Sequence, residues 1–105
     1  MIYEPSETPT INFTTSRQFA KDYKRLERSG RYDLDKIEQI LNHILDYLLN
    51  ETTMDPHYRD HALIGEWKGC RECHLLNDLL LIYEIDVEQH SLAFIRLGTH
   101  AQLFE

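Results

Sequence analysis

Three histidines and two carboxylates in the second half of the chain are of the right type for acid–base chemistry. They are His61, Glu72, His74, Asp78 and His100. Histidine has the unperturbed pKa nearest to neutrality, so one ring type can accept a proton in one step and donate it in another. Several histidines beside carboxylates therefore indicate proton transfer rather than binding alone.

The composition predicts one globular domain. The chain has 105 residues, of which 42% are hydrophobic and 28% are charged, and these values are typical of a single folded unit. No apolar run approaches the roughly 18 residues that a membrane-spanning helix needs. The segment Met1 to Glu7 lacks the basic and apolar regions of a signal peptide,. We therefore expect a cytoplasmic protein with two free thiols, a loose extension at residues 1–9 and one domain at residues 10–105.

The charge is unevenly distributed. The formal net charge of −7 argues against simple polyanion binding, yet residues 16–31 contain six basic and two acidic side chains. A local charge of +4 leaves −11 for the rest of the chain. A basic helix on an acidic body could contact phosphate on one face. An ordinary solvated helix face explains the same pattern equally well.

The periodicity of the apolar residues predicts two helices followed by strands. Residues 11–13 are a candidate strand, and Thr15 with Gln18 has the spacing of a capping box that opens a helix,. This helix ends at Ser29-Gly30, and Asp33 caps a second helix that ends near Asn50. Strands are predicted at residues 67–75, 79–85 and 92–97. The order β-α-α-β-β-β indicates an α+β fold, with a two-helix hairpin packed on a mostly antiparallel sheet.

A rival motif overlaps two of the candidate residues. The run Cys70-Arg71-Glu72-Cys73-His74 fits the haem c attachment pattern, and with His57 and His61 it could supply a zinc site,. Strand alternation places Cys70, Glu72 and His74 on one face and Arg71 and Cys73 on the other. Two thiols on opposite faces cannot easily share an ion, and haem c requires export. A small zinc-binding protein remains an alternative to an enzyme.

Five short blocks of sequence, in their order and spacing, resemble the RelE/ParE toxin superfamily and within it the YafQ-like mRNA interferases of type II toxin–antitoxin systems. The blocks are Tyr58-Arg59-Asp60-His61-Ala62-Leu63, Gly65-Glu66-Trp67-Lys68-Gly69, Arg71-Glu72-Cys73-His74, Asp78 to Tyr83, and Gly98-Thr99-His100-Ala101-Gln102-Leu103-Phe104. The resemblance implies a ribosome-dependent endoribonuclease that cleaves translated mRNA without metal or cofactor. It also implies a cognate, DinJ-like antitoxin and a toxin–antitoxin complex able to bind operator DNA.

The resemblance also implies which residues form the site. Catalytic roles fall on His61, His74, Asp78, His100 and Phe104, while Glu72 stands where the family has an aspartate. RNA carries its own nucleophile, the 2′-hydroxyl, so the site needs a base, an acid and donors that stabilise the phosphate charge. Asp78 is the candidate base or orients a histidine base, and His100 is the candidate acid.

Substrate contacts are expected from four further assignments. Arg96 could clamp a phosphate, Phe104 could stack on a base, and Lys68 and Arg71 could add phosphate contacts. Each has a structural alternative: Arg96 could pair with a carboxylate across the sheet, Phe104 could be a packing anchor, and Lys68 and Arg71 could be solvated.

The RelE/ParE fold leaves a second function open, because fold alone does not determine activity. ParE-type members inhibit DNA gyrase, and a toxin can decay to a non-catalytic module that only binds its antitoxin. The histidine set favours the nuclease, because a gyrase inhibitor has no need of it.

Overall fold

The computed structural model describes residues 11–50 and 52–105, so the predicted extension at residues 1–9 lies outside the described part. The elements are β1 (Asn12–Thr15), α1 (Arg17–Ser29), α2 (Leu34–Leu49), β2 (His61–Ala62), β3 (Arg71–Leu76), β4 (Leu79–Asp86), β5 (Ser91–Gly98) and α3 (His100–Phe104). The strands form one sheet in the order β1-β5-β4-β3-β2. This confirms the predicted α+β fold, with β2 and α3 as additions.

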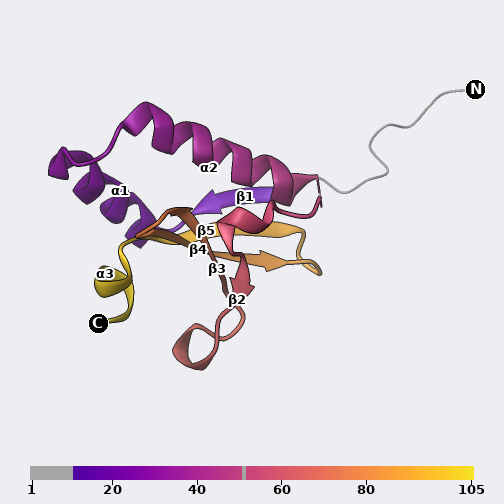
Figure 1. Cartoon of the computed structure of the whole chain (residues 1–105). Helices are drawn as coiled ribbons and strands as arrows, with labels where there is room; N and C mark the ends of the chain where they lie inside the picture. Colours follow the sequence, from indigo (N-terminus) through magenta and orange to yellow (C-terminus); the bar gives the residue numbers. More distant parts are fainter. Residues whose placement is uncertain (1–10, 51) are drawn as a thin grey trace, which may run out of the picture.

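The helix hairpin covers one face of the sheet, and α3 lies on the other face with the loop that follows β2 (Figure 1). The main core, between the helices and the sheet, contains Ile37, Leu81 and Tyr83. A smaller cluster on the opposite face is built around Ile82 and Leu103. Side chains of β4 are therefore buried on both faces, as its continuous apolar sequence predicts.

The helix boundaries follow from local capping. Ser16 caps α1, because its Oγ accepts a hydrogen bond of 2.9 Å from the backbone N–H of Phe19,. The predicted cap at Thr15 was wrong by one residue, since Thr15 still belongs to β1. Asp33 caps α2 as predicted. Gly30 ends α1 with φ of 66°, a conformation that glycine adopts without strain,.

One strand prediction was wrong at its start. Residues 67–70 are not part of β3, because Gly65–Trp67 form a 3₁₀ turn and Gly65 and Gly69 have positive φ values of 70° and 98°. This turn folds β2 back along β3, so that His61 lies opposite Glu72. At the other edge, β1 pairs with β5 in the parallel direction, while the remaining pairs are antiparallel.

None of the helices in the described part of the chain is both long and apolar enough to span a membrane.

Candidate active site

Glu72 lies between two of the predicted histidines. It is 5% exposed on β3, and its Oε1 is 3.5 Å from Nε2 of His61 and 3.4 Å from Nε2 of His74. His61 comes from the neighbouring strand β2, and His74 is two residues farther along β3 on the same face. The predicted alternation therefore brings two imidazoles onto one buried carboxylate, and their ring centroids are 6.3 Å apart.

One residue that the sequence analysis did not single out orients both rings. The backbone carbonyl of Arg59 faces Nδ1 of His61 at 2.8 Å, and its guanidinium Nη2 faces Nδ1 of His74 at 3.1 Å. A guanidinium can only donate, so Nδ1 of His74 accepts and the ring proton lies on Nε2, toward Glu72. Arg59 has a φ of 51°. Its only sequence signal was its place beside His61 in the first family-like block.

Asp78 and His100 form a second group. Asp78, in the turn between β3 and β4, accepts a hydrogen bond of 3.4 Å from the backbone N–H of His100, the first residue of α3. Thr99 and Gln102 close a capping box at this helix terminus,. The imidazole of His100 is largely exposed, and its centroid lies 5.0 Å from that of Phe104. The carboxylate of Asp78, the predicted base, therefore contacts the backbone of His100, the predicted acid.

The sheet places the two groups on the same face. His74 pairs with Leu80, and Leu80 pairs with Gly98, two residues before His100. Neighbouring strands are about 4.8 Å apart, so the backbones at His74 and Gly98 are separated by roughly 10 Å. Leu80 belongs to the small apolar cluster against which Phe104 packs. The two groups therefore lie on the same face of the sheet, on either side of Leu80 of β4.

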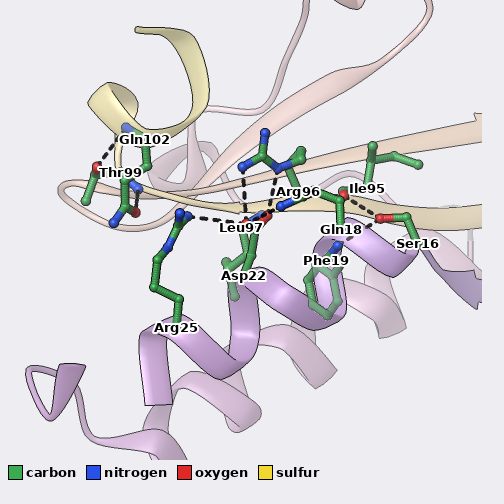
Figure 2. A network of polar contacts seen from close by, with 10 residues as sticks. All are labelled: Ser16, Gln18, Phe19, Asp22, Arg25, Ile95, Arg96, Leu97, Thr99 and Gln102. Carbon is green, nitrogen blue, oxygen red and sulfur yellow. Dashed lines mark hydrogen bonds and ion pairs between the residues drawn. The ribbon is translucent and has the colours of Figure 1, made fainter. Parts of the chain in front are cut away.

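Arg96 begins on this same face but is held by a helix. It pairs across β4 with Ile82, which in turn pairs with Glu72. Its Nε and Nη2 donate to the two carboxylate oxygens of Asp22 on α1 at 2.8 and 3.1 Å (Figure 2). The alternative that Arg96 pairs with a carboxylate is therefore correct, although the partner lies on a helix and not across the sheet.

Comparison with known proteins identifies the family. Residues 11–105 match the model of the YafQ family, bacterial toxins of type II toxin–antitoxin systems. The chain belongs to this family. It is 39% identical over 90 residues to the mRNA interferase toxin YafQ of Escherichia coli K12, covering 85% of this chain and 90% of that protein. The predicted resemblance is confirmed.

Solved structures of related toxins agree with the fold. The E. coli DinJ–YafQ complex contains a chain that matches with a TM-score of 0.73 and 35% identity, covering 90% of this chain and 99% of that one. A metal-bound toxin from Helicobacter pylori matches with a TM-score of 0.76 and 40% identity over the same shares of the two chains.

Two predicted phosphate contacts do not join the histidines in this YafQ-family toxin. Arg71 lies on the opposite face of β3, where its Nε and Nη2 donate to Asp60 at 3.2 and 2.9 Å. The Tyr83 hydroxyl donates to the same carboxylate. Burial and this contact raise the pKa of Tyr83, so it stays a neutral donor. Lys68 is exposed at the end of the 3₁₀ turn.

The two thiols of this toxin lie on opposite faces of the sheet, as the alternation predicted. Cys73 is fully buried in the main core, whereas Cys70 packs against the small apolar cluster. Burial raises the pKa of both thiols, which makes them poor metal ligands and poor nucleophiles. Within residues 11–50 and 52–105, no group of three or more histidine, cysteine, aspartate or glutamate side chains is arranged to hold a metal ion.

Proposed function

We propose that this chain is an endoribonuclease toxin that cleaves translated mRNA on the ribosome, using the surface formed by His61, Glu72, His74, Asp78 and His100. The observation that carries the proposal is their juxtaposition: two imidazoles meet at Glu72, and Asp78 contacts the backbone of His100. The relatives named mRNA interferases support the same substrate.

The proposed reaction is an internal transesterification. A base takes the proton of the 2′-hydroxyl, the 2′-oxygen bonds to phosphorus, and the bond from phosphorus to the 5′-oxygen breaks. The leaving 5′-oxygen takes a proton from an acid, so the products are a 2′,3′-cyclic phosphate and a 5′-hydroxyl. We assign Asp78 as the base, or as the group that orients a base, and His100 as the acid. The His74 ring lies between the Arg59 guanidinium and the Glu72 carboxylate, which fix its orientation, so we assign His74 a supporting role beside the phosphate,.

Base stacking is assigned to Phe104 and phosphate binding to Arg96. Phe104 is only partly buried, lies edge-on to Trp67 at 6.5 Å, and stands beside His100. Phe104 packs against the small cluster but is not fully buried, so we assign its exposed part to stacking on an unpaired base,. The exposed basic residues of α1 supply a surface for ribosomal RNA on an otherwise acidic protein,.

The proposed partner that silences the toxin is a DinJ-like antitoxin, and the complex of the two is proposed to bind operator DNA. The support is the E. coli relative, whose structure is a DinJ–YafQ complex. Co-expression of this chain with the antitoxin encoded beside it should restore growth. Persistent growth arrest in the presence of a bound antitoxin would contradict this assignment.

Replacing the proposed acid and base tests the nuclease. His100→Ala and Asp78→Ala should each abolish growth arrest after induction while the circular dichroism spectrum remains native, since each group contributes about 10²–10⁴ in rate. Mapping of mRNA 5′-ends should show new ends inside translated codons only with the unaltered chain. Full toxicity of both variants would refute the site, and DNA damage with intact mRNA would support the gyrase-inhibiting alternative.

The metal-binding alternative has one supporting observation, the metal-bound relative from H. pylori. Calorimetric titration of the purified chain with zinc and with copper tests it. Saturable binding that is lost in His61→Ala and His74→Ala would establish a metal site at Glu72. Unchanged cleavage after dialysis against a chelator would separate that site from the reaction.

A further inference from the structure

Asp22 is a buried carboxylate that the proposed chemistry does not use. It is 1% exposed, and it lies on α1 beside the edge of β5, where it accepts from the backbone N–H of Leu97 (Figure 2). Burying a carboxylate is costly unless hydrogen bonds and counter-charges replace water. Here Oδ1 accepts from Gln18, Arg25 and Arg96, and Oδ2 accepts from Arg96 and from the backbone of Leu97.

The first task of this carboxylate is to complete the edge of β5. The pairing with β1 ends at Thr15 and Phe94, but β5 continues to Gly98. Beyond that point α1 takes the place of a strand. The hydroxyl of Ser16 donates to the carbonyl of Ile95 at 2.6 Å, and Asp22 accepts from the N–H of Leu97 at 3.0 Å. The last residues of β5 are therefore held by a helix on one side and by β4 on the other.

The second task is to aim Arg96. Asp22 engages Nε and Nη2 of the guanidinium, which fixes the plane of this group through two hydrogen bonds,. The third nitrogen, Nη1, points away from Asp22 and α1 (Figure 2). Since Arg96 pairs with Ile82, and Ile82 with Glu72, the guanidinium starts on the face that carries the histidines. A guanidinium that uses Nε and Nη2 internally still has both N–H groups of Nη1 for a phosphate oxygen,.

The contact between Asp22 and Leu97 lies close to the start of α3. Gly98 follows Leu97, and a Cβ at this position would lie 2.8 Å from Oε1 of Gln102, the oxygen that accepts from the N–H of Thr99. The close packing of Gly98 against the capping box means that the end of β5 determines where α3 begins. His100 is the first residue of α3. Asp22 is therefore linked to His100, the proposed acid, through the last residues of β5.

We propose that Asp22 is a positioning residue, which holds Arg96 so that Nη1 binds the scissile phosphate and anchors the end of β5 from which His100 is presented. This inference rests on the proposed function, because Arg96 is a substrate contact only if the chain cleaves RNA. Asp22 itself does not touch the substrate, so it acts through Arg96 and through the backbone at Leu97.

The decisive experiment is a double-mutant cycle on Asp22 and Arg96. Purified Asp22→Asn, Arg96→Ala and the double variant are compared with the unaltered chain in a reconstituted translation system, with toxin in excess over ribosome-bound mRNA. Asp22→Asn should lower the single-turnover cleavage rate about 10- to 100-fold, as expected for a misplaced contact group. In the Arg96→Ala background the same substitution should cost less than about threefold, because asparagine keeps an oxygen that can accept from Leu97 and the lost charge acts through Arg96,. The matched control is Asp46→Asn, an exposed aspartate on α2, which should cleave at the native rate.

Hydrogen exchange at arginine side chains, measured spectroscopically in the unaltered chain, gives a second test. It needs neither a variant that folds nor the cleavage assay. The Nε–H of Arg96 should exchange with solvent at least about tenfold more slowly than that of the exposed Arg28, since buried hydrogen bonds protect against exchange,. Equal exchange rates at Arg96 and Arg28 would overturn the positioning role. It would also be overturned if the losses of cleavage rate caused by the two substitutions multiplied in the double variant. Protection of Arg96 in a chain that cleaves no mRNA would instead refute the proposed function and leave the anchor standing.

Discussion

Asp22 and Glu72 are both carboxylates that the fold removes almost entirely from water, yet their surroundings differ. Both oxygens of Asp22 accept hydrogen bonds: Oδ2 accepts from Arg96 at 2.8 Å and from Leu97 at 3.0 Å, and Oδ1 accepts from Arg96 at 3.1 Å. Glu72 faces two imidazole nitrogens at 3.4 and 3.5 Å, beyond the usual hydrogen-bond range of roughly 2.7–3.2 Å. The first carboxylate is fully engaged in holding the fold, and the second is left available to respond when charge develops on the histidines.

The largest effect should come from deleting the saturated carboxylate. Asp22→Ala leaves Arg96 and the N–H of Leu97 without their partner, and removing one member of a buried ion pair costs about 3–5 kcal/mol,. The free energy of unfolding, measured with urea, should fall by about this amount. A loss below about 1 kcal/mol would mean that Asp22 resembles a surface charge and would remove the contrast with Glu72.

The complementary substitution should affect the reaction instead of the fold. Glu72→Gln keeps the size of the side chain but removes the charge that orients and stabilises two imidazoles. The single-turnover cleavage rate should fall about 100-fold, while the free energy of unfolding changes by less than about 1 kcal/mol. A Glu72→Gln variant that unfolds as readily as Asp22→Ala would show that both carboxylates are structural.

The smallest expected effect is the loss of folding stability when acid protonates Asp22. Burial alone raises the pKa of Asp22, but the hydrogen bonds from Arg96, Leu97 and Gln18 outweigh it and hold this pKa below the ordinary 3.8. The resulting stability is complete above the ordinary pKa and is lost as the pH falls toward the lowered one, because the unfolded chain then binds the proton first.

The measurement is urea unfolding of the unaltered chain, Asp22→Asn and the exposed-site control Asp46→Asn at pH about 6 and about 3. The stability gap between the unaltered chain and Asp22→Asn should narrow at the lower pH, whereas the gap to Asp46→Asn should not. A gap that widens on acidification would reverse the sign of the Asp22 pKa shift.

The sequence predicted what local patterns determine. The apolar stripe of α2, its Asp33 cap and the continuous apolar run of β4 all depend on residues within a few positions of one another,. Alternation along β3 predicted that Glu72 and His74 share one face, and the structure places both beside each other there. The 3₁₀ turn at Gly65–Trp67 was not predicted, because its aromatic residue fits a strand equally well. Only the positive φ values of Gly65 and Gly69 show that the chain turns here.

Contacts between distant residues could not be predicted in this way. Asp22 and Arg96 are separated by 74 positions, and nothing in the sequence around either residue specifies the other. For the same reason the sequence could not predict the parallel pairing of β1 with β5 or the contact of the Arg59 guanidinium with His74, which lies 15 positions away. The roles assigned to the site residues stay predictions.

The hydrogen bond between Asp22 and Leu97 of β5 has a consequence for the time during translation at which the site can form. Its two partners come from opposite ends of the domain, and Arg96, His100 and Phe104 follow all the other strands in the chain. A nascent polypeptide that has not yet released these residues from the exit tunnel lacks both the clamp and the proposed acid. Such a chain cannot attack the message that encodes it, so toxicity begins only when translation of the domain is complete.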